Sequence, residues 1–166
     1  MDTLRLTQPL LIRHVRPDEA VALHTACFPD QSLDWVEDYL AWCLAAPGRP
    51  ARLIAILGSR IVAHVEITPR QNGAWAELSS LVVAEQERRH GIGRRVVSGA
   101  VRLARRWGCQ EIRLQVDVRK EALISMYRRW GFRLTGLPIA GRRWLLLPIP
   151  ESQPHPADNQ PSTVVF

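Results

Sequence analysis

One stretch of the sequence, Leu78 to Gly108, constrains the fold more than any other. The apolar run Leu81-Val82-Val83 is followed by a polar segment, by Gly91 and Gly93, and then by a helical pattern. This order predicts a strand that leads through a glycine-rich turn into the N-terminus of a helix. The first N–H groups of a helix have no partner within it, and the macrodipole makes that end partly positive, so the order favours binding of a phosphate group.

Basic side chains surround these glycines in the sequence: Arg88, Arg89, His90, Arg94 and Arg95. Two common phosphate-binding patterns are excluded. The sequence holds no Gly-x-x-x-x-Gly-Lys-Ser/Thr, and the dinucleotide fingerprint needs a third glycine where Val96 stands. What remains is Arg88-x-x-Gly91-x-Gly93 between an apolar strand and an amphipathic helix.

This remaining pattern resembles the acyl-CoA pyrophosphate loop of the GCN5-related N-acetyltransferases, the GNAT superfamily, whose motif is Gln/Arg-x-x-Gly-x-Gly/Ala in the same setting. Tyr127-x-x-x-Gly131-Phe132 matches a second family signature, and the resemblance covers about residues 74–147. It implies an α/β (α+β) GNAT acyl-CoA N-acyltransferase fold: a mixed, mostly antiparallel sheet with parallel strands 4 and 5, flanked by helices. In that fold strands 4 and 5 splay apart, and the pantetheine arm of the cofactor lies between them.

Periodicity and turn residues predict the other elements. Strands are expected at residues 10–15, 52–57, 60–68, 75–83, 111–116, 132–135 and 143–147, and helices at residues 17–28, 32–47, 91–107 and 121–130. Gly58-Ser59 is a two-residue hairpin turn, so the strands beside it should pair antiparallel. The strand, helix and strand between residues 75 and 116 favour a parallel pair with a right-handed crossover.

Length and composition indicate one domain at residues 1–148, followed at residues 149–166 by a Pro-, Ser- and Asn-containing tail that is expected to be disordered. The net charge of +6 is almost all arginine. It reflects either composition bias or attraction of an anionic partner such as CoA. Because no nucleic-acid-binding module accompanies the charge, nucleic acid is an unlikely partner.

The sequence also bears on compartment and metal content. No apolar run approaches the roughly 18–20 residues that a membrane-spanning helix needs. Asp2 and the lack of a long apolar stretch after it predict that the first residues are not a secretory signal. Cys27, Cys43 and Cys109 are scattered, which indicates neither a zinc site nor a disulfide framework. A cytoplasmic protein without a membrane partner or a metal is therefore expected.

The resemblance implies acetyl-CoA as cosubstrate and assigns residues to it. The backbone of the fourth strand would pair with the pantetheine arm, and the loop would hold the pyrophosphate. The residues so assigned are Leu81, Val82, Val83, Arg88, Arg89, His90, Gly91, Ile92, Gly93 and Arg94. Lys120 departs from the family pattern, because the family often has Asn seven residues before the signature tyrosine.

Acyl transfer to an amine requires removal of a proton from an ammonium group of pKa about 10, and an acid helps a thiolate leave. Glu77, eleven residues before Arg88, stands where some family members carry a catalytic glutamate. It is the expected base, unless it faces solvent or pairs with an arginine. Glu66 and His64 share one face of the preceding strand and are reserves. Tyr127 is the expected acid, or else a core tyrosine.

Three functions remain open at this point. The first is an N-acetyltransferase that moves the acetyl group of acetyl-CoA to a primary amine of a small molecule or protein in a ternary complex. The second is a non-catalytic acyl-CoA-binding regulatory module, and the third is a basic nucleic-acid- or partner-binding protein. A homodimer is common in the family. Aromatic residues of the second helix, Trp35, Tyr39 and Trp42, either line the acceptor site or pack in the core.

Overall fold

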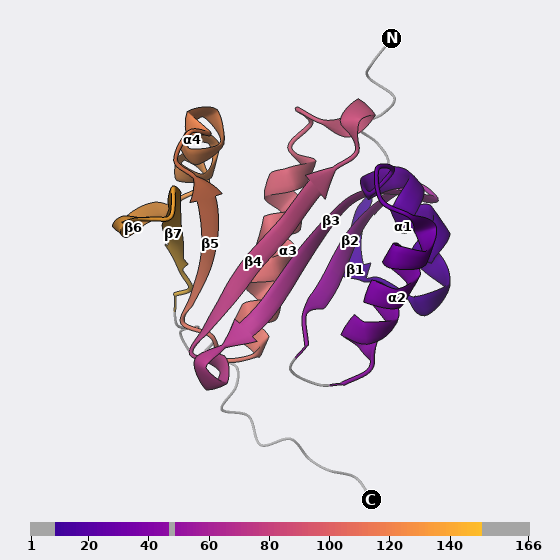
Figure 1. Ribbon diagram of the computed structural model, residues 1–166, viewed down its shortest axis with the longest axis horizontal. Helices are drawn as coiled ribbons and strands as arrows, with labels where there is room; N and C mark the ends of the chain where they lie inside the picture. The colour runs from indigo at the N-terminus through magenta and orange to yellow at the C-terminus, as the bar shows by residue number, and fades with distance from the viewer. Residues whose placement is uncertain (1–8, 47–48, 151–166) are drawn as a thin grey trace, which may run out of the picture.

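The computed structural model describes residues 9–46 and 49–150. These residues form one seven-stranded sheet in the order β1-β2-β3-β4-β5-β7-β6 (Figure 1). Its strands are β1 (Leu10–His14), β2 (Ala51–Leu57), β3 (Arg60–Arg70), β4 (Trp75–Val83), β5 (Glu111–Asp117), β6 (Arg133–Ile139) and β7 (Arg142–Pro148). Neighbours pair antiparallel except β4 and β5, which are parallel. The expected mixed sheet is thus confirmed.

Four helices cover the two faces of the sheet in the described part of the chain: α1 (Ala20–Cys27), α2 (Leu33–Leu44), α3 (Ile92–Arg106) and α4 (Glu121–Arg129). In Figure 1, α1 and α2 lie in front of β1–β3, and α3 lies behind the sheet. Two apolar clusters follow from this arrangement. The first joins α1 and α2 to the sheet around Leu23 and Leu40, and the second joins α3 and α4 to the sheet around Val96 and Tyr127.

The sequence pattern of α3 predicts its buried face correctly. Ile92, Val96, Ala100 and Leu103 are all buried, because apolar residues at steps of three and four fall on one side of a helix. Gly99 lies on the same side and lets the helix approach β1 closely. A Cβ atom built at Gly99 would lie 2.8 Å from Ile12 Cγ2, so the sheet leaves no room for a larger residue there.

The aromatic residues of α2 do not form its core face. The residues buried under α2 are Val36, Leu40 and Cys43. Trp35 and Trp42 are 44% and 46% exposed, so the prediction that they pack in the core is wrong for these two residues.

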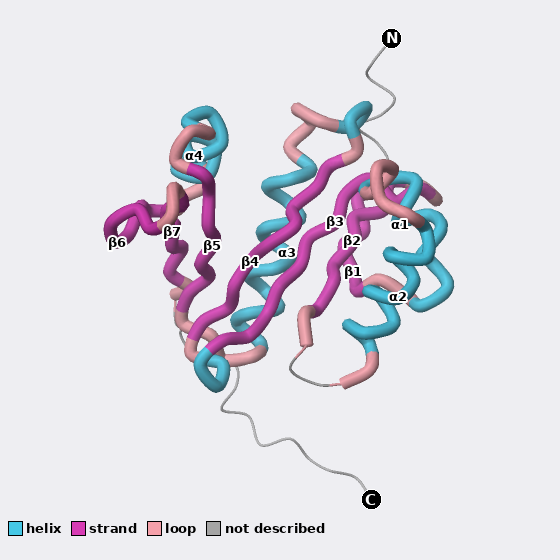
Figure 2. The backbone as a smooth tube through the Cα atoms, viewed as in Figure 1, coloured by secondary structure: helices cyan, strands magenta, loops and turns pink. Residues whose placement is uncertain are grey.

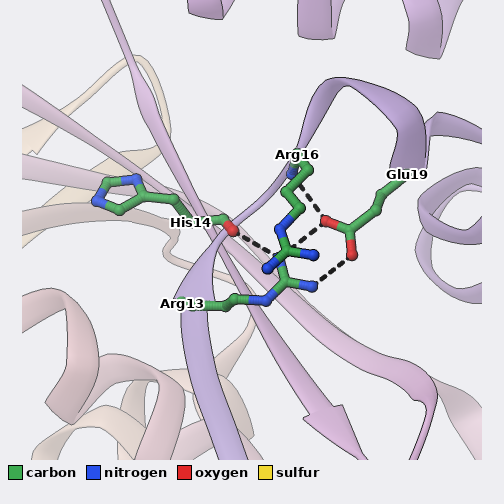
Figure 3. A network of polar contacts seen from close by, with 4 residues as sticks. All are labelled: Arg13, His14, Arg16 and Glu19. Atoms are coloured by element: carbon green, nitrogen blue, oxygen red, sulfur yellow. Dashed lines mark hydrogen bonds and ion pairs between the residues drawn. The ribbon is translucent and has the colours of Figure 1, made fainter.

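The turn between β1 and α1 is fastened by charged groups (Figure 3). Arg13 donates to the carboxylate of Glu19, which also accepts the backbone N–H of Arg16 at 2.7 Å. The hydrogen bond from Arg13 lowers the pKa of Glu19. The pair therefore fixes the start of the helical layer against the edge of the sheet.

The C-terminal boundary differs slightly from the expectation. Ile149, placed by the sequence in the tail, is buried, and its N–H donates to the Gln110 carbonyl at 2.8 Å. The packed domain therefore extends at least to this residue, and residues 151–166 of the expected tail lie outside the described residues. None of the described helices is long and apolar enough to cross a membrane.

Candidate active site

Strands β4 and β5 touch only at their beginning. Their parallel pairing covers Trp75 to Glu77 on β4, and beyond that the strands diverge (Figures 1 and 2). The other edge of β4 stays paired with β3. The edge of residues 78–83 that faces β5 therefore has no strand partner. The carbonyl of its last residue, Val83, accepts Arg88 Nε at 3.1 Å, and the earlier backbone groups of this edge can pair with an extended ligand. The splay implied by the family resemblance is present.

A bulge interrupts β4 inside this unpaired stretch. In the β3–β4 register, Glu66 lies opposite Ser79, and His64 lies opposite Val82, so β4 has one more residue than β3 in between. Ser80 within the bulge has φ 49°, a left-handed conformation that is uncommon for a residue other than glycine. An extra residue of this kind bends its strand and changes the local twist. The bulge therefore redirects the last residues of β4.

The loop after β4 is held by contacts on its far side. The N–H of Ala84 donates to the Val62 carbonyl at 2.9 Å. The short 3-10 helix η4 (Glu85–Glu87) follows, and the buried Glu87 carboxylate pairs with Arg60 at 3.0 Å. Pairing with an arginine satisfies this buried charge, which would otherwise be costly. The loop is thus anchored to the β2–β3 hairpin rather than hanging free.

The N-terminus of α3 opens toward solvent at the end of this loop. Gly91 is the N-cap residue with φ 75°, and the first helical hydrogen bond runs from the Arg95 N–H to the Gly91 carbonyl at 3.2 Å. The N–H groups of residues 92–94 therefore have no helical acceptor. A Cβ atom at Gly91 would meet nothing within 4 Å, so the space above these groups is open. The basic side chains next to Gly91 in the sequence are exposed: Arg88, Arg89, His90, Arg94 and Arg95.

Gly93 has a different reason to be glycine. A Cβ atom there would lie 3.2 Å from the Trp130 ring and 3.5 Å from Val83 Cγ2. The first turn of α3 thus packs between the end of β4 and the end of α4. The sequence identified Trp130 only as part of a helix face. In the structure its ring packs against Gly93 in the first turn of α3. The packing at Gly93 therefore fixes the position of the free N–H groups at the start of α3.

Glu77 lies where the splay begins. It is the last β4 residue paired with β5, and its carboxylate accepts Arg70 Nε at 2.9 Å. The side chain keeps 23% of its surface exposed. The arginine pair anticipated as one alternative is therefore present, together with access from solvent. The role of this residue as a base stays a prediction.

Tyr127 is buried, as the core interpretation expected. Its ring meets Trp130 and Phe132 edge-on, with both centroid distances 5.4 Å. Burial raises the pKa of Tyr127 to about 12, so the phenol keeps its proton over the working range of an enzyme. Packing of the ring and donation from the hydroxyl are compatible, and the role as an acid stays a prediction.

The two reserve residues belong to a buried cluster that the sequence did not reveal. Arg52 on β2 reaches His64 Nε2 at 3.2 Å and the Glu66 carboxylate at 3.3 Å. Ser79 on β4 also donates to Glu66, at 3.3 Å. The residues come from three consecutive strands, β2, β3 and β4, and meet through the register of these strands. We call Arg52, His64 and Glu66 the buried triad.

The imidazole of His64 is neutral in this setting. Burial, and next the charge of Arg52, lower the pKa of His64 to about 3. Its Nδ1 lies 3.0 Å from the Ser80 carbonyl, which can only accept. The proton therefore sits on Nδ1, and the Nε2 lone pair faces Arg52. This lone pair is already engaged, which makes His64 less suitable as a base than the solvent-accessible Glu77.

Aromatic rings from the helical layer cover the buried triad. The Arg52 guanidinium lies over Tyr39, with its Cζ 4.0 Å from the centroid of the tyrosine ring. Phe28 meets His64 edge-on, with the two ring centroids 5.1 Å apart. Tyr39 also stacks between Trp35 and Trp42, with centroid distances of 5.3 and 5.6 Å. Burial is the main cause that raises the pKa of Tyr39. We call Trp35, Tyr39 and Trp42 the aromatic ledge.

Among residues 9–46 and 49–150, no group of three or more His, Cys, Asp or Glu side chains is arranged to hold a metal ion. The three cysteines are buried and unpaired.

An unpaired strand edge beside an open, glycine-flanked helix N-terminus is the arrangement expected of an α/β domain that binds an extended, phosphate-bearing ligand. Comparison with known families gives the particular family. The sequence model of the acetyltransferase (GNAT) family matches residues 18–132, and the chain belongs to that family.

Individual relatives agree with this assignment. The chain is 35% identical over 79 residues to GCN5-related N-acetyltransferase 4, chloroplastic, of Arabidopsis thaliana; the match covers 48% of this chain and 26% of the relative. The chain thus spans about a quarter of that protein's length.

Solved structures share the fold at low identity. One is a ribosomal-protein-alanine N-acetyltransferase from Brucella melitensis, with a TM-score of 0.68, 20% identity and coverage of 83% of this chain and 99% of that one. Another is an aminoglycoside 6'-N-acetyltransferase complexed with coenzyme A, with a TM-score of 0.65, 18% identity and coverage of 84% and 97%.

Proposed function

We propose that this protein is an N-acetyltransferase that moves the acetyl group of acetyl-CoA to a primary amine by direct attack in a ternary complex. One observation carries the proposal: the unpaired edge of β4 ends beside the open N-terminus of α3, where Gly93 packs against Val83. An extended arm and a pyrophosphate are the two parts of CoA that such a surface would hold. Membership of an acetyltransferase family supports the same activity.

The chain's own groups divide the work of binding acetyl-CoA. The backbone of Leu81, Val82 and Val83 would bond to the amides of the pantetheine arm, as a neighbouring strand would. The free N–H groups of α3 and the basic side chains of the loop would hold the pyrophosphate. The residues assigned to this second task are Arg88, Arg89, His90, Gly91, Ile92, Gly93 and Arg94.

Glu77 would remove the proton from the acceptor. In the reaction a bond forms between the amine nitrogen and the acetyl carbon, and the carbon–sulfur bond breaks. Because an alkyl ammonium has a pKa of about 10, a base is needed near neutral pH. Glu77 is the proposed base because its carboxylate is accessible at the start of the splay. The bond from Arg70 orients that carboxylate.

Tyr127 would stabilise the departing sulfur. A thiol has a pKa of about 8.5, and burial raises the pKa of Tyr127 to about 12. Full proton transfer from the phenol to the thiolate is therefore uphill. The hydroxyl would act as a hydrogen-bond donor to the sulfur, and the proton released by the amine would complete the thiol.

The acceptor is an amine of a small molecule or a protein. The structural neighbours include a ribosomal-protein-alanine, an aminoglycoside and a spermidine N-acetyltransferase, whose names refer to three kinds of amine acceptor. The half-exposed aromatic ledge beside the buried triad is the surface in this chain that would contact an acceptor. A cytoplasmic location and a homodimer stay predictions, and the named relative is chloroplastic.

Thermal unfolding with and without acetyl-CoA tests the proposal, with ATP and NAD as controls. Acetyl-CoA at 100 times its dissociation constant should stabilise the fold by about 2.7 kcal/mol. Release of free thiol is then followed with spermidine, an aminoglycoside and a peptide that begins with alanine. Stabilisation without thiol release from any amine would favour a non-catalytic acyl-CoA-binding module. No stabilisation by acetyl-CoA at millimolar concentration would contradict the proposal.

A further inference from the structure

The bulge in β4 lies within the strand edge that we propose for the pantetheine arm. Its first residue, Ser80, holds φ 49°, and the residues directly after it, Leu81 to Val83, form the last part of the unpaired edge. A serine does not adopt this conformation without support from its surroundings. The direction in which the backbone of Leu81–Val83 points therefore depends on whatever holds the Ser80 peptide.

His64 is the group that holds it. Nδ1 lies 3.0 Å from the Ser80 carbonyl, and Nε2 lies 3.2 Å from Arg52. The edge of Phe28 packs against the ring at 5.1 Å, and the side chain is fully buried. Three contacts therefore fix the position of the imidazole. Its contact with β4 is the hydrogen bond from Nδ1 to the carbonyl of Ser80, the residue with the left-handed backbone conformation.

A neutral imidazole suits this position for a chemical reason. It carries a donor at one nitrogen and an acceptor at the other. Arg52 can only donate, so it requires the acceptor at Nε2 and thereby places the proton on Nδ1, facing Ser80. Arg52 contacts His64 through Nη1 and donates to the Glu66 carboxylate through Nη2, so Glu66 keeps the guanidinium in place. The triad consequently delivers a single N–H to the bulge.

We propose that His64 is a positioning residue for acetyl-CoA, which fixes the β4 bulge through the Ser80 carbonyl and so aims the backbone of Leu81–Val83 at the pantetheine arm. This inference rests on the proposed function and adds a residue that contacts neither the arm nor the reacting atoms. It also predicts that loss of His64 affects binding of the pantetheine arm more than binding of the pyrophosphate. The pyrophosphate loop has an anchor of its own in the pair of Glu87 with Arg60, besides the bond from Arg88 Nε to the Val83 carbonyl, so it should depend on His64 less than the arm does.

Two substitutions divide the contacts of the imidazole. In His64→Asn, the amide N–H occupies the place of Nδ1 and can still donate to Ser80, but the acceptor for Arg52 is lost. In His64→Gln, the longer amide can accept from Arg52, but the donor to Ser80 is lost. Each variant removes one hydrogen bond, so a general loss of stability should affect both alike. Calorimetry then measures binding of acetyl-CoA and of ADP, which has the pyrophosphate but lacks the arm.

The wild type and His64→Asn should bind acetyl-CoA within threefold of each other, whereas His64→Gln should bind at least tenfold more weakly, by about 1.4 kcal/mol or more. Both variants should bind ADP as the wild type does. Equal affinity of the two variants for acetyl-CoA would overturn the inference, and so would a parallel loss of ADP binding. Failure of the wild type itself to bind acetyl-CoA would instead contradict the proposed function.

Nitrogen NMR of the wild type gives a second test that needs no variant. The His64 ring should show the neutral form protonated at Nδ1, and acetyl-CoA should shift the amide signals of Leu81–Val83 while ADP leaves them in place. Protonation at Nε2, or equal shifts with both ligands, would overturn the inference.

Discussion

The two sides of the candidate site are built from different parts of the chain. On the cofactor side, the loop and the start of α3 present backbone N–H groups, and Gly91 keeps the space before them open. On the side where we propose that the acceptor binds, the buried triad joins side chains of β2 and β3 under the rings of α1 and α2, and its His64 reaches β4 on the cofactor side. The first side acts through backbone groups at a helix terminus, whereas the second is built from side chains that meet across neighbouring strands and helices. Substitutions should therefore affect the two sides in different ways.

The largest effect is expected at the junction of the two sides, from Glu77→Gln. Removal of the base should lower turnover by about 10²- to 10⁴-fold, while binding of acetyl-CoA stays unchanged. The loss should be greatest at low pH, where the fraction of neutral amine is smallest. The measurement is a pH–rate profile by thiol release.

Glu111→Gln is the matched control for this prediction. Glu111 also pairs with an arginine of the sheet, Arg113, but lies on β5. Turnover of this variant should stay within a few-fold of the wild type. An unchanged pH–rate profile in Glu77→Gln would move the role of base to Glu66.

A smaller effect is expected from Tyr127→Phe. The ring contacts with Trp130 and Phe132 remain, so thermal stability should change little. Turnover should fall about 10- to 100-fold, which corresponds to the 1.5–3 kcal/mol of a hydrogen bond to a charged group. Steady-state kinetics measure the effect, and unaltered turnover would leave the hydroxyl without a catalytic part.

Gly99→Val tests whether Gly99 serves packing of α3 on the sheet, in contrast to Gly91, which keeps the start of the same helix open. The new side chain would meet Ile12, and Val has little advantage in helix propensity over Gly, so the clash dominates. The free energy of unfolding should fall by about 1–3 kcal/mol, measured in urea, with acetyl-CoA affinity unchanged. Ser98→Val, at the exposed neighbouring position, should be milder. Weaker cofactor binding in Gly99→Val without a loss of stability would contradict this division.

The smallest effect is a pH dependence of stability on the buried side. Because the folded state holds the pKa of His64 at about 3, below its ordinary 6.5, unfolding takes up a proton below pH 6.5. The stability is present above pH 6.5 and is lost as the pH falls toward 3. Between pH 7 and pH 5 this residue should account for a loss of about 2 kcal/mol, which His64→Asn should not show. Identical slopes in urea unfolding of the two proteins would contradict the neutral, buried imidazole.

The cofactor side could be predicted from the sequence because its signals are local. Apolar alternation placed β4, and two glycines before an amphipathic pattern placed the loop and the start of α3. The buried triad could not be predicted in this way. Arg52 and His64 meet only through the β2–β3 register, and the bulge at Ser80 carries no residue that typifies a left-handed conformation. Periodicity also could not separate the stacked rings of α2 from its core face.

The central claim is that the N-terminus of α3 holds the cofactor, and one pair of variants tests it most directly. Gly91 and Gly108 lie at opposite ends of α3, with φ 75° and 80°, and a Cβ atom at either meets nothing within 4 Å. Gly91→Glu and Gly108→Glu thus carry similar backbone strain and the same added charge. Calorimetric titration with acetyl-CoA should show binding weakened more than about 100-fold in Gly91→Glu, by about 2.7 kcal/mol or more, and within threefold of the wild type in Gly108→Glu. Binding of acetyl-CoA by Gly91→Glu with the affinity of the wild type would contradict the account.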